Sequence, residues 1–405
     1  MVRSASLACK GKLPVLLIAG ALWLVRPGAG FAAQQKASCD AQPGFAKVGK
    51  LLGKKEYQGA KEILSILQAC PNLSQLEVFN VGWLYGRAHD FSQALKIFDS
   101  VPPDVPDPLT HGYAIALSQF ELGSYQPAID GLNKLRSQGA FDAKCADLLG
   151  VSYSKLGRYQ EAYPIMAENL QHNPTDPFAH FNLITLFVDA GETAKAAQVA
   201  DNAVAALPRS AEALVMRGSI KMSQSRFEAA YDDFSAAADI SRHSPDPRFF
   251  MALSDYKQRK FVEGAEELKA AIRSGIVDSD LHYLLAECII RMNSSSSSAA
   301  LAELNRAIEL DPKSVSARTL RGKMLLEAGH PQDALIDLRV ARELAPNPER
   351  DSRNATYLLA RTYMALGERD QANTLFAQVN SQFILNNLDT LNELGDRRMK
   401  AVLHP

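Results

Sequence analysis

The sequence predicts an all-α fold, an α-solenoid in which about ten helix-turn-helix units stack in a row. Three observations lead to this prediction. One residue pattern recurs every 34 residues. Small residues occupy two fixed positions of each unit, and glycine and proline stand at fixed places between the helices. Because each unit of such an array contacts only its neighbours, a chain of this length can form one array without dividing into globular domains.

The first 33 residues have the features of an export signal. Basic residues precede an apolar run over residues 13–25, and small residues near Ala32 and Ala33 suit cleavage by a signal peptidase. The alternative is an uncleaved membrane anchor, but the run has 13 residues and a bilayer requires about 20. We therefore expect residues 1–33 to be a cleaved signal peptide and the mature protein to be exported, either periplasmic or secreted, with no membrane span.

Removal of the signal would leave a mildly acidic chain. The signal contains four basic residues and no acidic residue, so 40 basic and 45 acidic residues would remain, a net charge of about −5. No block of basic residues follows. Because nucleic-acid-binding proteins carry a basic patch, we expect no nucleic-acid partner.

The repeat pattern is strictly periodic in the first seven units and less regular in the last three. The seven regular units begin at Ala41, Gln75, Leu109, Ala143, Pro177, Ala211 and Pro245. The others begin near Ser279, at Val315 and near Arg353. The predicted array covers residues 41–380. Residues 381–405 are expected to form a capping helix and a tail that frays from Arg397, and the apolar stripe of that helix is Phe383, Leu388, Leu391 and Leu394.

Small residues stand where the two helices of one unit should cross most closely. Position 8 of the unit is small in eight of ten units, and position 20 is alanine or glycine in all ten. Position 24 holds a larger apolar residue in most units and lies one turn after position 20. Glycine at position 15 of five units is expected to end the first helix in a left-handed conformation.

Cys39 and Cys70 are predicted to form a disulfide. Cys39 precedes the first helix and Cys70 ends its antiparallel partner, so the fold should bring them together. Export would expose them to an oxidising environment, and the loop-entropy model gives this link about 3–4 kcal/mol of stability. The alternative is two free thiols. Cys145 and Cys288 are expected to be small buried residues.

The sequence contains none of the common catalytic motifs. HExxH, GxSxG, a phosphate-binding glycine loop and CxxC are absent, and the eight histidines are scattered singly. We therefore predict a non-enzymatic protein with no catalytic residues, no metal site and no cofactor. An enzyme with an unrecognised site is the alternative.

Over residues 41–380 the pattern resembles the tetratricopeptide repeat family, whose arrays form right-handed superhelices that bind peptides or partner proteins in a concave groove. In that family, positions 2, 5, 9, 12 and 13 of the first helix line the groove. Carried onto this sequence, the resemblance implies a partner-binding groove made by Phe79, Trp83, Arg87, Tyr113, Phe120, Phe178, Phe181, Phe249, Tyr256 and Tyr357. Polar residues at the same positions include Lys144, Asp147, Asp189, Lys323 and Arg361.

The resemblance implies an exported scaffold for protein–protein interaction. Aromatic residues at helical spacing also pack between repeats, so the sequence leaves open whether these rings are exposed in the groove or buried. If they are exposed, they suit an apolar or aromatic segment of a partner. A repeat that binds a glycan by stacking on Phe79, Trp83 and Tyr113 is a further alternative.

Overall fold

The computed structural model describes residues 41–292, 297–345 and 353–379, together with Gly395 and Arg398. The expected signal peptide, Cys39 and the apolar stripe of the expected capping helix lie outside the described residues. Within the described ranges all regular structure is helical and there is no strand. The predicted all-α class is therefore confirmed.

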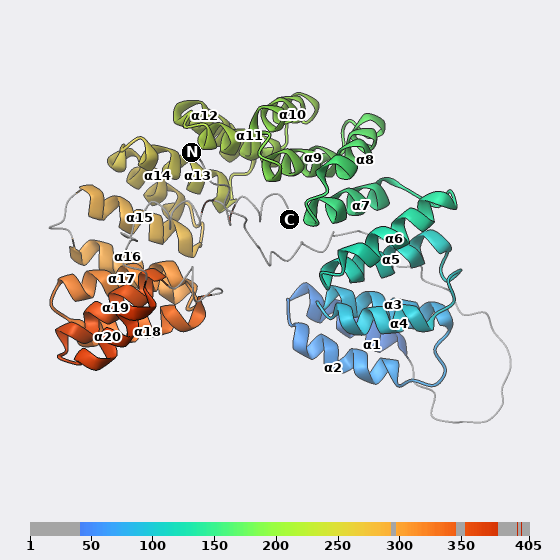
Figure 1. Cartoon of the computed structure of the whole chain (residues 1–405), viewed down its shortest axis with the longest axis horizontal. Coiled ribbons are helices and arrows are strands. Elements are labelled where there is room, and N and C mark those ends of the chain that lie inside the picture. The colour runs from blue at the N-terminus through green and yellow to red at the C-terminus, as the bar shows by residue number, and fades with distance from the viewer. Residues whose placement is uncertain (1–40, 293–296, 346–352, 380–394, 396–397, 399–405) are drawn as a thin grey trace. The chain divides into compact units, whose positions relative to one another are not determined.

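The described chain contains 20 helices and divides into two compact units, one ending at Val199 and one beginning at Ala200 (Figure 1). Helix α10 (Thr193–Ala206) crosses the boundary. The helices of unit 1 are α1 (Ala41–Gly53), α2 (Tyr57–Gln68), α3 (Gln75–Arg87), α4 (Phe91–Ser100), α5 (Pro108–Glu121), α6 (Tyr125–Ser137), α7 (Ala143–Lys155), α8 (Tyr159–His172) and α9 (Pro177–Asp189). Those of unit 2 are α11 (Ala211–Ser223), α12 (Phe227–Ile240), α13 (Pro245–Lys257), α14 (Phe261–Arg273), α15 (Ser279–Met292), α16 (Ser297–Leu310), α17 (Val315–Glu327), α18 (Pro331–Leu344), α19 (Arg353–Ala365) and α20 (Arg369–Gln378).

The helices alternate between two roles. We call the odd-numbered helices A helices and the even-numbered ones B helices, because each A helix begins where the sequence predicts a new repeat. The only start that differs within the described residues is that of α5, which begins at Pro108 instead of Leu109. Proline suits the first turn of a helix, and the Asp107 carboxylate caps it by accepting the backbone N–H of Thr110 at 2.9 Å.

In several repeats the A helix packs against its own B helix through a glycine at position 8. A Cβ atom added to Gly82 would lie 2.8 Å from the Phe98 ring, and one added to Gly150 would lie 2.6 Å from Met166. The same contact joins Gly218 to Phe234 at 2.7 Å. The large partner is in each case the residue at position 24, so the small residue makes room for the large one across the helix pair.

The turn between A and B helices requires a left-handed residue at position 15. The predicted glycines take this conformation, with φ of 71° at Gly157 and 76° at Gly191. In four units another residue type is held in the same conformation: Lys55, His89, Ser225 and Arg259, with φ of 56–63°. The tight turn therefore imposes the conformation even where the sequence supplies no glycine.

Two repeats each contain a buried ion pair that joins position 7 of the A helix to position 23 of the B helix. In α11 and α12, Arg217 Nη2 lies 2.6 Å from Asp233 Oδ1. In α17 and α18, Arg321 Nε lies 2.6 Å from Asp337 Oδ2, and Arg318 Nη1 lies 3.1 Å from the same carboxylate. Both aspartates are buried, so these pairs hold A to B inside each unit.

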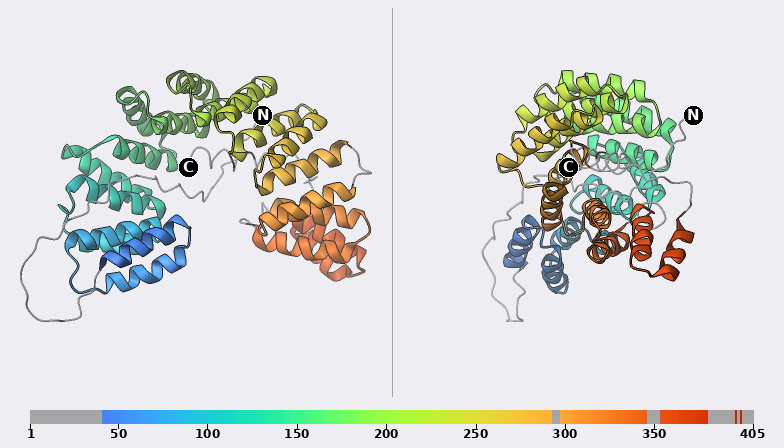
Figure 2. Two further views of the ribbon diagram at one scale, coloured as in Figure 1. Left: turned by 180° about the vertical axis from the view of Figure 1, so that it is seen from behind. Right: turned by 90° about the vertical axis from the view of Figure 1, so that its left-hand side faces the viewer.

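Consecutive helix pairs stack through both kinds of helix. Most B helices contact the following A helix, as α4 does α5 and α12 does α13, and several neighbouring A helices contact one another, as α7 does α9 and α13 does α15. Helix α18 contacts α17 and α19, and α19 contacts α20, within the group of orange to red helices in Figure 2. We call the surface formed by the A helices within each unit the A-helix face.

The described cysteines are of two kinds, free and disulfide-bonded. Cys145 and Cys288 are free and buried, as expected. Cys70 is disulfide-bonded, and its partner lies outside the described residues, where Cys39 is found. The pairing with Cys39 stays a prediction.

Candidate functional site

Most of the aromatic residues predicted to line the groove are buried. Phe79, Tyr113, Phe120, Phe181, Phe249 and Tyr256 are buried, Trp83, Phe178 and Tyr357 are half-buried, and Arg87 is exposed. They come from five A helices, α3, α5, α9, α13 and α19, and do not form one cluster. The six buried rings are therefore packing residues, and they offer little free surface to a ligand.

Contacts around Phe79 show why these rings are buried. The centroid of the Phe79 ring lies 5.0 Å from that of Phe98 on α4 and 6.0 Å from that of His111 on α5, so the ring fills the space between consecutive repeats. Trp83 stacks beside it at 6.5 Å. Tyr357 occupies the same position of the repeat as Phe79, but it lies on the last A helix that the structure describes and stays half-buried.

Exposed apolar side chains on the A-helix face are fewer than predicted and of a different type. Leu76 is 39% exposed, Val188 is 52% exposed and Met364 is 46% exposed. They occupy position 2 or 12 of their repeats. Lys144, at position 2, is exposed, and Trp83, at position 9, is half-buried. The available surface on this face is thus a mixture of aliphatic and charged groups.

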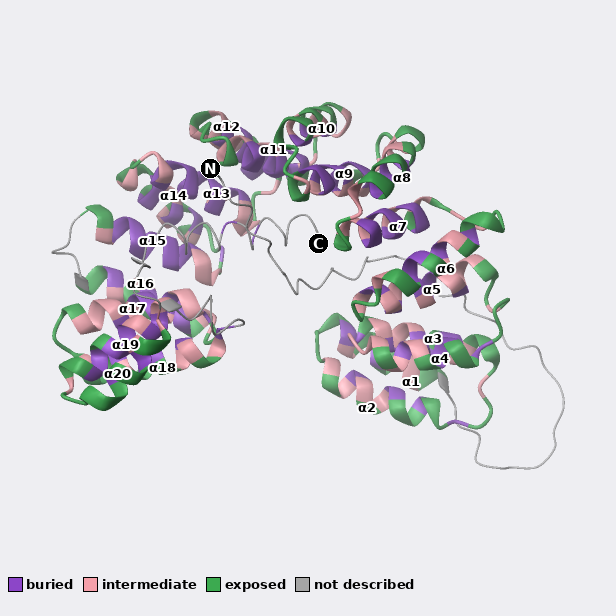
Figure 3. Ribbon diagram, viewed as in Figure 1, coloured by how far each residue is buried: buried purple, intermediate pink, exposed green. Residues whose placement is uncertain are grey.

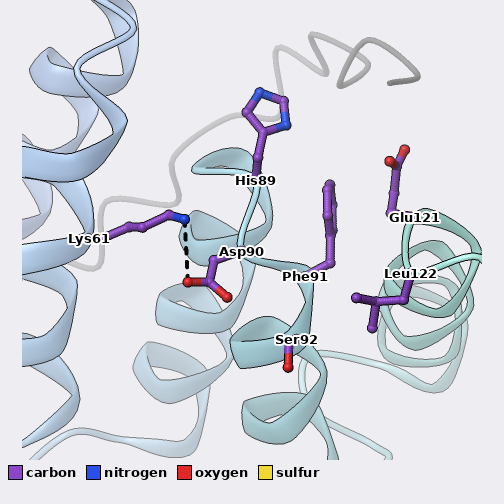
Figure 4. A pocket seen from close by; sticks show the side chains of 7 residues that line it. All are labelled: Lys61, His89, Asp90, Phe91, Ser92, Glu121 and Leu122. Carbon is purple, nitrogen blue, oxygen red and sulfur yellow. Dashed lines mark ion pairs between the residues drawn. The ribbon is translucent and has the colours of Figure 1, made fainter. Parts of the chain in front are cut away.

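A small pocket of about 340 Å³ opens beside the turn between α3 and α4 (Figure 4). Lys61 reaches into it from α2, and its Nζ lies 3.4 Å from Asp90 Oδ2. Asp90 also caps α4 by accepting the backbone N–H of Gln93. Burial raises the pKa of Glu121, on the opposite wall, to about 7. Asp90 and Lys61 are thus used in a helix cap and an ion pair.

Helices α13 and α15 contain more buried residues than the other A helices that the structure describes. Every residue of α15 from Leu281 to Ile289 is buried, and so are nine residues of α13 (Figure 3). Eight residues are buried in α11 and four in α17. The A-helix face of α13 and α15 is therefore covered as well as the side that packs on the B helices.

Arg398 lies against this covered face and is 7% exposed. Its Nη1 lies 2.7 Å from Asp246 Oδ1, its Nε lies 3.1 Å from Asp280 Oδ2, and its Nη2 contacts Asp278 Oδ1. The guanidinium carbon lies 4.6 Å from the centroid of the Phe249 ring. The tail was expected to fray from Arg397, whereas Arg398 is held by three carboxylates and an aromatic ring.

The nearby carboxylates favour the charged form of the Arg398 guanidinium. Burial alone would lower the pKa of the Arg398 guanidinium, but Asp278, Asp280 and Asp246 raise that pKa on balance. For Asp246 the balance is the reverse: burial raises its pKa, and the nearby guanidinium offsets part of this shift. The guanidinium therefore compensates for the cost of burying the carboxylate.

Gly395 marks a second contact on the same face. A Cβ atom added to Gly395 would lie 3.1 Å from Leu253 Cδ2 and 4.0 Å from the Phe250 ring. Phe249 and Leu253 occupy positions 5 and 9 of the repeat, two of the positions that line the groove in the family. Two residues of a remote segment therefore contact α13 where the resemblance places a ligand.

A buried polar network continues along α13 and α15. The Tyr283 hydroxyl donates to Glu287 Oε1 at 3.2 Å and the Tyr256 hydroxyl donates to Glu287 Oε2 at 3.4 Å. Arg291 Nε donates to the Tyr256 hydroxyl at 3.0 Å. Burial and the Glu287 carboxylate raise the pKa of Tyr256 to about 12. Tyr256 thus joins two A helices through its hydroxyl.

Sequence reasoning missed the acidic residues around Arg398. Asp246 and Asp280 both occupy position 2 of their repeats, so the rule that nominated the aromatic residues could have found them. Nothing in the sequence links Arg398 to them, since it lies 118 residues from Asp280 and 152 from Asp246.

Two other kinds of site are absent from the part of the chain that the structure describes. In these ranges there is no group of three or more His, Cys, Asp and Glu side chains that could hold a metal ion. Nor do the described helices include one that is both long and apolar enough to cross a membrane.

The fold places this chain in the class of all-α proteins that are built from two-helix repeats. Family models described as tetratricopeptide repeat match residues 181–245, 290–348 and 354–383. The ten A helices begin at or next to the predicted repeat starts, which extends the same unit to the rest of the described chain. The matched ranges are therefore tetratricopeptide repeats, and proteins that contain such repeats in general bind protein partners.

Several known proteins are similar to this chain at low identity. Human DnaJ homolog subfamily C member 3 is 22% identical over 254 residues, which cover 62% of this chain and 45% of that protein. Anaphase-promoting complex subunit 3 of Schizosaccharomyces pombe is 21% identical over 299 residues, covering 73% of this chain and 44% of that protein. The matched region spans less than half the length of these curated relatives. A tetratricopeptide repeat protein from Parabacteroides merdae has a solved structure with 20% identity and a TM-score of 0.48, covering 63% of this chain and 98% of that one.

Proposed function

We propose that this chain is an exported, non-enzymatic scaffold that binds a polypeptide segment of a partner protein on its A-helix face. The observation that carries the proposal is the contact of α13 and α15 with Arg398 and Gly395. Arg398 and Gly395 are more than 100 positions away in sequence from these helices. They contact residues at positions 2, 5 and 9 of the repeats. This face of unit 2 is thus shaped and charged to hold a polypeptide segment.

The alternatives find less support. Stacking of a glycan on Phe79, Trp83 and Tyr113 requires exposed rings, but Phe79 and Tyr113 are buried and Trp83 is half-buried. An enzyme requires a polar group free to react in a cleft. In the described pocket the Asp90 carboxylate is used in capping and ion pairing, and among the described residues no group that could hold a metal ion lies beside the Glu121 carboxyl.

Export is part of the proposal and rests on residues 1–33 of the sequence. The disulfide at Cys70 supports it, because disulfides persist mainly in oxidising compartments. The test is to fractionate the cells that make the protein and to sequence the N-terminus of the mature chain. Export predicts a start near Ala33 outside the cytoplasm, and an intact N-terminus in the cytoplasmic fraction would contradict it.

Partner binding on the A-helix face can be tested with matched exposed residues. In unit 1, Leu76→Asp changes the A-helix face and Ile66→Asp changes exposed surface on B helix α2. In unit 2, Met364→Asp and Ile336→Asp form the corresponding pair on α19 and α18. Because all four side chains are exposed, the variants should fold normally.

The readout is quantitative mass spectrometry of proteins that co-purify with each variant from its own cells. The proposal predicts that at least one A-helix variant loses a specific partner that both B-helix variants retain. Equal loss from the A-helix and B-helix variants, or no loss from any of them, would contradict binding on this face.

A further inference from the structure

We propose that Asp246, Phe249, Asp278 and Asp280 form a recognition site for an arginine side chain of a partner segment, and that Arg398 occupies this arginine site in the free chain. The inference rests on the proposed function, because it specifies the chemistry of the segment that the A-helix face binds. It concerns unit 2 only.

The arginine site contacts each nitrogen of the guanidinium separately. Asp246 accepts from Nη1 at 2.7 Å, Asp280 accepts from Nε at 3.1 Å, and Asp278 accepts from Nη2. Phe249 lies under the group, with 4.6 Å between the guanidinium carbon and the ring centroid. A planar cation with donors on three nitrogens fits this arrangement, whereas a lysine ammonium has neither the flat face nor the fork of donors.

The site is positioned by the repeats and does not depend on Arg398 for its shape. Asp278 Oδ1 accepts the backbone N–H groups of Asp280 at 2.9 Å and Leu281 at 3.2 Å, so it caps helix α15. Asp246 and Asp280 are the second residues of α13 and α15, where the partial positive charge of a helix N-terminus stabilises a carboxylate. Phe249 is fixed by its edge-to-face contact with Phe250 at 5.6 Å. The recognition groups are therefore held in place before an arginine arrives.

The contact at Gly395 adds a second requirement for the ligand. Gly395 precedes Arg398 by three residues, and a Cβ atom there would lie 3.1 Å from Leu253 Cδ2. A larger side chain would have to displace Leu253, which is itself buried. The preferred ligand is therefore a segment with a small residue three positions before an arginine.

A partner segment must compete with Arg398 for the arginine site. A group tethered to the same chain has an effective concentration of about millimolar when the linker is flexible and long enough. Removal of the Arg398 side chain should therefore expose the site and strengthen binding of a segment added in solution.

The experiment uses a fluorescently labelled peptide with the sequence of residues 393–400, ELGDRRMK, and the full chain. Its affinity is measured by fluorescence anisotropy for the wild type and for the Arg398→Ala and Arg397→Ala variants. We expect the Arg398→Ala chain to bind the peptide about tenfold more tightly than the wild type. The Arg397→Ala chain is the matched control for loss of one positive charge, and its affinity should stay close to that of the wild type.

Changes to the peptide and to the site complete the test. Alanine or lysine at the peptide position equivalent to Arg398 should weaken binding to the Arg398→Ala chain about tenfold or more. Asp278→Asn in that chain should have a similar effect. If circular dichroism shows that Arg398→Ala is unfolded, the Arg398→Lys variant keeps the charge and takes its place.

The result that would overturn the proposal is a peptide affinity that is the same for the wild type and the Arg398→Ala chain, or that does not depend on the peptide arginine. Arg398 would then be a structural contact only. That failure leaves the proposed function intact if the Leu76→Asp or Met364→Asp variant still loses a partner that its B-helix control retains, so the two proposals fail separately.

Discussion

Glycine-to-alanine substitutions at two helical positions of unit 1 should change stability in opposite directions. Gly82 lies inside α3 and Gly131 lies inside α6. Alanine favours the helix over glycine by about 1 kcal/mol at either position. At Gly131 a Cβ atom meets nothing within 4 Å, so Gly131→Ala should stabilise the protein by about that amount. At Gly82 the Cβ atom would lie 2.8 Å from the Phe98 ring and 3.0 Å from Ile97.

Overpacking of this kind costs about 1–3 kcal/mol, because the buried ring has to move. Gly82→Ala should therefore be less stable than Gly131→Ala by about 1–3 kcal/mol, since the gain in helix propensity is common to both. Gly150→Ala should be intermediate, because the group in its way is the flexible Met166 side chain. The assay is urea unfolding followed by far-UV circular dichroism. Equal stabilisation by Gly82→Ala and Gly131→Ala would refute the reasoning that position 8 is the close crossing of each repeat.

Four further predictions concern other parts of the chain. Asp337→Ala removes the carboxylate that pairs with Arg318 and Arg321 and should cost about 3 kcal/mol in urea unfolding, whereas Glu343→Ala on the exposed side of α18 should cost little. Phe79→Ala should lower stability by about 3 kcal/mol, because the ring is buried between repeats, and a change in partner binding without loss of stability would show that the ring is a contact surface. Burial raises the pKa of Asp147 from 3.8 to about 6 in the folded state. Because this pKa exceeds the unfolded value, the contribution of Asp147 to stability is present at low pH and is lost as the pH rises. The free energy of unfolding should therefore decline by about 3 kcal/mol as the pH rises to about 7. Asp147→Asn should remove this decline, which unfolding midpoints at low and neutral pH will measure. Non-reducing peptide mapping should join Cys39 to Cys70, and Cys70→Ser should cost about 3 kcal/mol, whereas alkylation of both thiols in the native chain would contradict the link.

The repeat boundaries were readable from the sequence because they depend on local contacts. Position 8 meets position 24 within one helix pair, as Gly150 meets Met166, so the residue types at a fixed spacing carry the information. The turn at position 15 is equally local. Even there nothing in the residue type of Arg259 indicates the left-handed conformation of a glycine, because the tight turn overrides the preference of the residue.

The exposure of the candidate site could not be read in the same way. Whether a ring at position 5 is free depends on how closely the next repeat packs, and that is a contact between units. Phe79 is buried by Phe98 and His111, while Tyr357 at the same position is half-buried. The contact of Arg398 with Asp246 joins residues 152 positions apart, and a single sequence contains no signal that pairs them.

The central claim is that the A-helix face binds a polypeptide segment of a partner, and site-specific photo-crosslinking tests it most directly. A photoreactive residue is placed at Leu76, Val188 or Met364 on the A helices, or at Ile66, Ile240 or Ile336 on the B helices, all of them exposed. The cells that make the protein are then irradiated, and crosslinked proteins are identified by mass spectrometry. We predict a common partner crosslinked from A-helix positions and absent from B-helix positions. Crosslinks to the same partner chiefly from B-helix positions would contradict the account.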